Sequence, residues 1–292
     1  MRQELPIDDV MPAIKQALAA NREAVVVAEP GAGKTTRVPL ALLNEPWLAG
    51  RKIVMLEPRR LAARTVSRYM AKMLGEPVGV TVGYRIHRDT CVSPKTRLEV
   101  VTEGVLTRML QSDPAMLDVG LIIFDEFHER SLAADLGLAL AIDSQEVIRE
   151  DLKILVMSAT MEPEPVAGLM GGVPVITSEG RSFPVTTFYL PQPAGDRLYQ
   201  VMAGAVRQAL ARHTGDILVF LPGLPEIKKM TSILAGERLD PNIKVFTLYG
   251  DLSAQEQDEV LLPAAPGQRK IVLATSIAET SLTVEGITVV ID

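Results

Sequence analysis

Residues 24–36 read AVVVAEPGAGKTT, an apolar run followed by a glycine-rich turn and the start of a helical pattern. The apolar run over 24–29 is typical of a strand buried on both faces of a parallel sheet. In the turn, glycines allow backbone N–H groups to approach phosphate oxygens, and a helix beginning there adds its positive dipole end. Lys34 can reach the β- and γ-phosphates, and the Thr35 hydroxyl can bind Mg²⁺. The stretch therefore predicts a phosphate-binding loop in an α/β fold.

The loop departs from the usual pattern at its first position, where Ala28 replaces glycine. A small side chain is tolerated there if the backbone torsions are ordinary. The alternative is a generic glycine turn between strand and helix, which the strand, GAGKT and helix in succession disfavour. The predicted nucleotide-binding residues are Ala28, Glu29, Pro30, Gly31, Ala32, Gly33, Lys34, Thr35 and Thr36.

A second apolar run ends on two acids, in the stretch GLIIFDEFHER over residues 120–130. We expect its strand to lie beside the phosphate-loop strand, with Asp125 and Glu126 at the carboxyl edge, where open α/β sheets bind ligands. Asp125 would hold the metal and Glu126 would polarise the water that attacks the γ-phosphate. A solvated turn is the alternative for such an acid pair, and the upstream phosphate loop disfavours it.

Strand-like and helical patterns alternate along the whole chain, which predicts mostly parallel sheets flanked by helices. A change to Gly- and Pro-rich sequence around 171–195 predicts a domain boundary, giving domains 1–182 and 183–292. The predicted strands are 24–29, 52–58, 97–102, 119–125, 153–160, 216–222, 243–250, 270–276 and 287–292. The predicted helices are 59–74, 131–148, 196–213, 224–235 and 254–262, after a short amphipathic helix near the N-terminus.

Composition limits the class of protein. The chain has 292 residues, 47% hydrophobic and 23% charged, as in globular proteins. A single cysteine, Cys91, excludes an internal disulfide and favours the cytoplasm. No run reaches the ~18 apolar residues that a membrane span needs. The net charge of −6 argues against a nucleic-acid binder of the whole-surface kind, so nucleic acid would meet a local groove. An acidic enzyme acting on small molecules stays open on these numbers alone.

The DEFH stretch resembles the DEAH box of superfamily 2 helicases, with Phe127 in place of alanine. Other motifs of this DEAH/RHA family follow in order, and DEFHERSLAADLGLALA is most similar to its bacterial HrpB-type subgroup. The matching segments are LEPRRLAA (56–63, motif Ia), TEGVLTRML (102–110, motif Ib), SAT (158–160, motif III), VFLPGLPEI (219–227, motif IV), TLYGDLSAQEQ (247–257) and ATSIAETSLT (274–283, motif V).

The resemblance implies two RecA-like domains that close on ATP and Mg²⁺ while single-stranded RNA or DNA crosses both. It implies a catalytic group of Lys34, Asp125, Glu126 and His128, in which His128 contacts the facing domain and reports closure. Ser158 and Thr160 would couple the nucleotide to nucleic acid. Arg and hydroxyl donors grip phosphates without reading sequence. The positions that match nucleic-acid contacts are Arg59, Arg60, Thr102, Thr107, Arg108, Thr275, Ser276, Thr280 and Ser281.

Three departures from the family pattern qualify these expectations. Arg68 is the predicted base contact, but 258–270 offers no aromatic partner, so we expect use of several NTPs. Ser276 stands where relatives often have asparagine. The arginine-rich motif VI and the C-terminal domains are absent, and the final run ITVVID predicts truncation, with a true edge strand as the alternative. We therefore expect this chain to bind nucleotide but to hydrolyse it slowly and not to unwind duplexes.

The leading hypothesis is the core of an ATP-dependent helicase acting on RNA or DNA, with no obligate protein partner implied. Two alternatives remain. One is a P-loop ATPase that moves other cargo, although LEPRR and ATSIAETSLT would then have no purpose. The other is a nucleotide-dependent nucleic-acid-binding module that does not separate strands.

Overall fold

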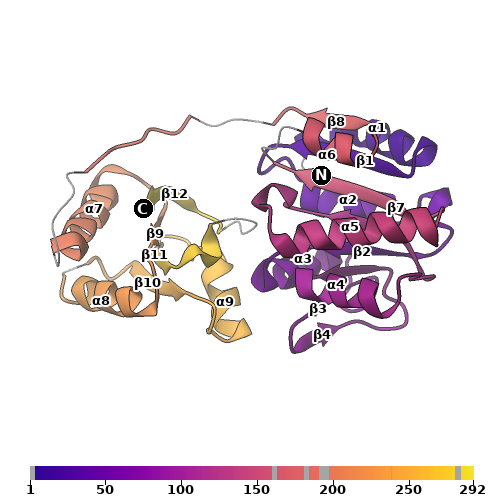
Figure 1. Ribbon diagram of the computed structural model, residues 1–292. Coiled ribbons are helices and arrows are strands. Elements are labelled where there is room, and N and C mark those ends of the chain that lie inside the picture. Colours follow the sequence, from indigo (N-terminus) through magenta and orange to yellow (C-terminus); the bar gives the residue numbers. More distant parts are fainter. Residues whose placement is uncertain (1–3, 160–162, 181–183, 191–196, 238, 280–283) are drawn as a thin grey trace. The chain divides into compact units, whose positions relative to one another are not determined.

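The chain forms two compact units, residues Met1–Pro184 and Val185–Asp292 (Figure 1). The computed structural model describes residues 4–159, 163–180, 184–190, 197–237, 239–279 and 284–292. The predicted boundary at 182/183 lies outside the described residues. Within the described ranges, no helix is both long and apolar enough to span a membrane.

Sheet A of the first unit runs in the order β4-β3-β5-β2-β6-β7-β1-β8, parallel except for the β3–β4 pair. Its strands are β1 (Glu23–Ala28), β2 (Lys52–Leu56), β3 (Val82–Ile86), β4 (Asp89–Cys91), β5 (Leu98–Val101), β6 (Val119–Phe124), β7 (Lys153–Ser158) and β8 (Val175–Ser178). The helices are α1 (Pro6–Ala20), α2 (Lys34–Leu42), α3 (Arg60–Met73), α4 (Glu103–Ser112), α5 (Leu132–Val147) and α6 (Glu164–Leu169), with short 3-10 turns η1 (Pro46–Leu48) and η2 (Phe127–Glu129).

One expectation about strand neighbours is wrong. The strand that ends in the acid pair, β6, does not lie beside the phosphate-loop strand β1, because β7 pairs with both and separates them. Apolar content does not encode which buried strands become neighbours, so the sequence could not exclude this order. Both acids still follow a strand whose carboxyl end lies at the same edge as that of β1.

Helices cover both faces of sheet A, as expected for continuous apolar strands. Side chains alternate between faces along a strand, so Val26 packs with α1, α2 and α3 while Val25 packs with α4, α5 and α6. On the first face Ile14, Val38 and Met70 are buried against the strands. The result is the doubly wound α/β arrangement that the alternating pattern predicted.

Sheet B of the second unit runs in the order β10-β11-β9-β12, and its pairs are all parallel. In the described part of this sheet, β12 pairs with β9 at one edge. A separate core packs α7 and α8 against these strands, with Val206, Ile227 and Met230 buried. The elements are α7 (Leu198–Arg212), β9 (Asp216–Phe220), α8 (Leu224–Ala235), β10 (Ile243–Leu248), α9 (Ala254–Leu261), β11 (Arg269–Ala274), a 3-10 turn η4 (Ser276–Ala278) and β12 (Ile287–Ile291).

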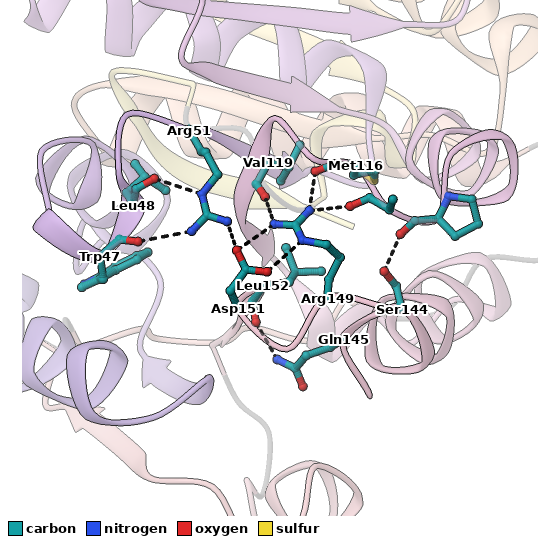
Figure 2. A network of polar contacts seen from close by, with 12 residues as sticks. Trp47, Leu48, Arg51, Met116, Val119, Ser144, Gln145, Arg149, Asp151 and Leu152 are labelled. Carbon is teal, nitrogen blue, oxygen red and sulfur yellow. Dashed lines mark hydrogen bonds and ion pairs between the residues drawn. The ribbon is translucent and has the colours of Figure 1, made fainter. Parts of the chain in front are cut away.

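A buried arginine ties together the amino ends of β6 and β7 (Figure 2). Arg149 donates to the carbonyl oxygens of Met116 at 2.7 Å and Val119 at 2.9 Å, and also to that of Ala115. Its Nε donates to the Asp151 carboxylate at 2.9 Å, and Arg51 pairs with the same carboxylate. This network fixes the loop ahead of the strand that carries the acid pair.

Candidate active site

The phosphate loop joins β1 to α2 and is shaped by two glycines in the left-handed region. Gly31 has φ 80° and Gly33 has φ 94°, values that L side chains rarely adopt. A Cβ on Gly33 would also lie 2.6 Å from Leu5 Cδ1, because the start of α1 packs on the loop. The Ile7 N–H donates to the Ala32 carbonyl oxygen at 3.1 Å. The conformation of the loop is therefore stabilised by contacts with the start of α1 as well as by its own glycines.

The remaining predicted loop residues occupy the positions that the motif requires. Ala28 is buried at the end of β1, in ordinary strand geometry, so its departure from glycine has no visible cost. Glu29 and Pro30 are exposed at the turn. Lys34 is the first residue of α2, followed by partly buried Thr35 and Thr36.

Lys34 lies among three carboxylates. Its Nζ is 3.0 Å from Glu126 Oε1, and both side chains are buried. Burial by itself would lower the pKa of Lys34, but the negative charges of Asp125, Glu126 and Glu57 raise it above its ordinary value. The lysine therefore remains an ammonium, and the motif on β1 meets the acid pair after β6 although β7 lies between them.

Asp125 is a buried carboxylate with a raised pKa. It is 1% exposed, and its Oδ1 accepts from the Glu126 N–H at 2.8 Å. Oδ2 has no hydrogen-bond partner in the part of the chain that the structure describes. Burial raises the pKa of Asp125 to about 6, against the opposing effect of Lys34, while Glu126 adds to the rise and the nearby Thr35 hydroxyl reduces it. A cation beside Oδ2 would supply the partner that this oxygen lacks and would lower the pKa of Asp125.

The segment after the acid pair is a short turn with left-handed residues at both ends. Glu126 has φ 51° and Arg130 has φ 49°, and η2 lies between them. Such torsions cost about 1 kcal/mol or more each for residues other than glycine. Phe127 offsets this cost by packing edge-to-face on buried Phe124, with centroids 6.2 Å apart, and the Arg130 guanidinium lies over the Phe127 ring. The family's alanine is thus replaced here by an anchor.

His128 contacts groups of its own unit. Its Nδ1 accepts from the Ala159 N–H at 3.3 Å, and its Nε2 lies 3.3 Å from Glu126 Oε2. With Nδ1 as acceptor, the neutral ring carries its proton on Nε2 and donates toward Glu126. Ser158 is fully buried at the end of β7, and its Oγ lacks a partner among the described groups. Thr160 lies outside the described residues.

The predicted nucleic-acid residues of the first unit lie at the start of α3 and along the first half of α4. Arg59 Nε is 3.6 Å from Glu129 Oε2, and Arg60 donates to the His87 carbonyl oxygen at 3.2 Å. Thr102 is buried at the N-cap position of α4. Thr107 is half-buried and its Oγ1 lacks a partner within the described ranges, whereas Arg108 is exposed.

Arg68, the predicted base contact, lies in helix α3. Its charge acts on Tyr84 of β3, whose pKa is raised chiefly by burial and by Asp89, with Arg68 opposing. The Tyr84 hydroxyl donates to Asp89 Oδ2 at 3.1 Å. In the strand order β3 lies near one end of the sheet and β1 near the other. A base contact by Arg68 stays a prediction without a described contact to support it.

Two of the predicted residues of the second unit, Thr275 and Ser276, lie at the carboxyl end of β11. Thr275 follows the strand directly and Ser276 begins η4. Ser276 lines a cavity of about 300 Å³ together with Phe220, Pro222, Glu279 and Asp292. Thr280 and Ser281 lie outside the described residues.

Sequence reasoning missed three residues that the geometry brings to the site. Glu57 follows β2 as Asp125 follows the adjacent β6, and an acid directly after a buried strand was the available signal. Glu129 and Glu103 reach the site through Arg59 and Ser131. Neither has a local signal, because each pairs with a residue distant in the sequence.

Comparisons with known proteins agree with this geometry. Residues 9–168 match the family model of the DEAD/DEAH box helicase, and residues 198–292 match that of the helicase conserved C-terminal domain. The chain is 51% identical over 288 residues to the ATP-dependent RNA helicase HrpB of Escherichia coli (strain K12), covering 99% of this chain and 35% of that protein. The chain thus spans about a third of the length of that curated relative.

Two solved structures are similar throughout. The Escherichia coli DEAH/RHA helicase HrpB matches with a TM-score of 0.90 at 50% identity, over 98% of this chain and 36% of that one. The E. coli DExH-box NTPase HrpB matches with a TM-score of 0.81 at 50% identity, over 99% of this chain and 36% of that one. These matches confirm the predicted pair of RecA-like domains, and the chain belongs to the DEAD/DEAH box helicase family.

Proposed function

We propose that this chain is the motor core of an ATP-dependent RNA helicase of DEAH-box type. The observation that carries the proposal is the buried cluster in which Lys34 of the phosphate loop meets Asp125 and Glu126. RNA as the nucleic acid rests on the similarity to the Escherichia coli relative, an ATP-dependent RNA helicase. The partner would be single-stranded RNA or DNA, and the protein would act in the cytoplasm.

The residues present fit a Mg²⁺ ion accompanying ATP. Asp125 offers a buried oxygen, Oδ2, without a partner among the described groups, and the Thr35 hydroxyl interacts with the same carboxylate group. Mg²⁺ keeps several waters and phosphate oxygens as ligands, so it needs few ligands from the protein. When bound, Mg²⁺ would neutralise phosphate charge. Thr35 and Asp125 would hold it.

The ion pair between Lys34 and Glu126 suggests how the site changes when ATP enters. A γ-phosphate is a stronger partner for the ammonium than a carboxylate, so Lys34 would exchange Glu126 for phosphate oxygens. Glu126 would then be available to accept a proton from the attacking water, and His128 would hold its other oxygen.

The remaining roles extend this proposal to nucleic acid. Arg59, Arg60 and Arg108 would bind backbone phosphates in the first unit, with Thr102 and Thr107 beside them. Thr275, Ser276, Thr280 and Ser281 would do so in the second unit, and Ser158 and Thr160 would link the two sites. Several NTPs would serve as substrates, because base contact would be limited to Arg68. Slow hydrolysis by this chain stays a prediction.

Lys34→Ala tests the proposal directly. We expect the affinity for the Mg²⁺ complex of a non-hydrolysable ATP analogue to fall by about 2 kcal/mol or more, roughly 30-fold, as for other truncated buried charge partners. Isothermal titration calorimetry measures this, with the exposed Lys95→Ala as the matched control. Equal affinities for the two variants would contradict the proposal. Fluorescence anisotropy with a labelled oligouridine then separates a nucleic-acid motor from an ATPase that moves other cargo.

A further inference from the structure

The turn over residues 126–131 contacts the phosphate loop through Lys34 and the end of β7 through Ala159. Glu126 pairs with Lys34 of the phosphate loop at 3.0 Å. His128 accepts from the Ala159 N–H at 3.3 Å, which joins the turn to the end of β7. These two contacts alone place one side of the turn in the nucleotide site.

The other side of the same turn contacts the nucleic-acid motifs. Glu129 Oε2 lies 3.6 Å from Arg59 Nε at the start of α3. Ser131, the N-cap of α5, donates to the Glu103 carboxylate in the first turn of α4. A change in the partner of Arg59 therefore acts on the segment that holds Glu126, three residues away.

The turn is stiff enough to transmit such a change. Its ends are left-handed at Glu126 and Arg130, and buried Phe127 fixes its middle on Phe124. Strained torsions persist only where surrounding contacts hold them, so loss of one tether shifts the balance of the others. An incoming anion can replace the Glu129 carboxylate as the partner of Arg59.

We propose that Glu129 is a positioning residue that couples nucleic-acid binding to the nucleotide site, by holding Arg59 until a backbone phosphate displaces it. This inference rests on the proposed function. The pair suits an exchange, because both side chains are partly exposed, 26% for Arg59 and 20% for Glu129, and such ion pairs are weak in water. A phosphate binds arginine bidentately and would replace the carboxylate without leaving a buried charge.

The exchange predicts positive coupling. Nucleotide binding removes Lys34 from Glu126, and oligonucleotide binding removes Arg59 from Glu129, so both ligands favour the released turn. Each ligand then tightens the binding of the other by the same factor. In a chain without the Glu129 carboxylate, the pair with Arg59 is already lost before any ligand binds. Binding of one ligand should then change the affinity for the other very little.

The test measures that factor in the chain itself, without hydrolysis. Fluorescence anisotropy gives the Kd of a labelled 20-nucleotide oligouridine with and without a saturating Mg²⁺ complex of a non-hydrolysable ATP analogue. We expect a ratio of at least about 5 for the unaltered chain, within the usual range of couplings. For Glu129→Gln we expect about threefold tighter oligonucleotide binding without nucleotide, and a ratio near 1.

Two further variants separate coupling from simple charge removal. In an Arg59→Gln background, adding Glu129→Gln should leave the ratio unchanged, because the carboxylate acts through Arg59. The control is Asp135→Asn, which removes the neighbouring ion pair with Arg130 at 3.2 Å. Its ratio of Kd values should equal that of the unaltered chain. Melting temperatures of all variants establish that they fold.

The outcomes divide clearly. A ratio in Glu129→Gln equal to that of the unaltered chain, even with tighter binding, overturns the inference and leaves the proposed function standing. A ratio near 1 in the unaltered chain does the same. Failure of the unaltered chain to bind analogue or oligonucleotide overturns the proposed function instead.

Discussion

The two edges of sheet A bury charge in opposite ways. At the amino edge, Arg149 is 4% exposed and its guanidinium donates to the carbonyls of Ala115, Met116 and Val119 and to Asp151 (Figure 2). At the carboxyl edge, Lys34 faces an excess of carboxylates. There Asp125 Oδ2 and Ser158 Oγ lack partners within the described chain.

This difference separates a structural site from a functional one. A buried polar group without a partner costs about 1 to 3 kcal/mol, and a ligand that supplied the partner would recover that free energy on binding. At the amino edge, the guanidinium of Arg149 is bonded to backbone carbonyl oxygens of the same unit. At the carboxyl edge, Asp125 Oδ2 and Ser158 Oγ could still bond to a ligand. Substitutions at the two edges should therefore change different quantities.

The largest effect should come from Arg149→Met. The change leaves three backbone carbonyl oxygens without their charged donor, and we expect the free energy of unfolding to fall by about 3 to 5 kcal/mol. Urea unfolding measured by tryptophan fluorescence is specific to the first unit, because the chain has one tryptophan, Trp47, which lies in this network. Analogue affinity of the folded variant should stay within about twofold.

The matched control for that prediction is the exposed Arg212→Met in the second unit, which should leave the transition of Trp47 unchanged. A loss of analogue affinity in folded Arg149→Met that exceeds tenfold would break the comparison, since it would make the amino edge part of the active site.

Asp125→Asn should raise the free energy of unfolding, by less than Arg149→Met lowers it. The pKa of Asp125 is raised to about 6 from 3.8, so the stability that its protonated form contributes is complete below 3.8 and is lost as pH rises through 6. We therefore expect the variant to be more stable by about 1 to 3 kcal/mol at pH 8, and by progressively less as pH falls toward 4. Analogue binding should lose its dependence on Mg²⁺.

Urea unfolding at pH 8, 6 and 4.5 measures this difference, with the exposed Asp143→Asn as control. A variant less stable than the parent at pH 8 would show that Asp125 serves packing as well as ligand binding.

Long periodic segments and the phosphate loop could be predicted from the sequence because their signals are local. The predicted helix 224–235 has those bounds in the structure, and the predicted strand 119–125 ends one residue earlier as β6. Three short strands, β3, β4 and β8, were not predicted. β8 has two exposed residues out of four, so it lacks the continuous apolar run that identified the others.

The order of strands and the partners of single side chains are set by tertiary packing, which local patterns do not encode. β7 lies between β6 and β1 although all three are buried, mainly apolar strands, so the predicted adjacency was wrong. The described contacts of His128 within its own unit are Glu126 and Ala159, and the contact with the facing domain that the resemblance implies stays a prediction. Lys34 and the acid pair met as expected, because the carboxyl ends of parallel strands share one edge whatever the strand order.

The smallest effect should come from Asp151→Asn, at the exposed side of the Arg149 network. Hydrogen bonds from Arg149 hold the pKa of Asp151 well below its usual range, and Arg51 adds to this. Its stabilisation is therefore present above pH 3.8 and lost as pH falls below that value, the reverse of the dependence at Asp125. Because 56% of the side chain is exposed, solvent screens the pair, and we expect a loss of at most about 1 kcal/mol, smaller still in 1 M NaCl. Urea unfolding at pH 7 and pH 3 in low and high salt measures it. A loss as large as that of Arg149→Met would mean that the carboxylate, not the backbone carbonyls, accounts for the stability of this edge.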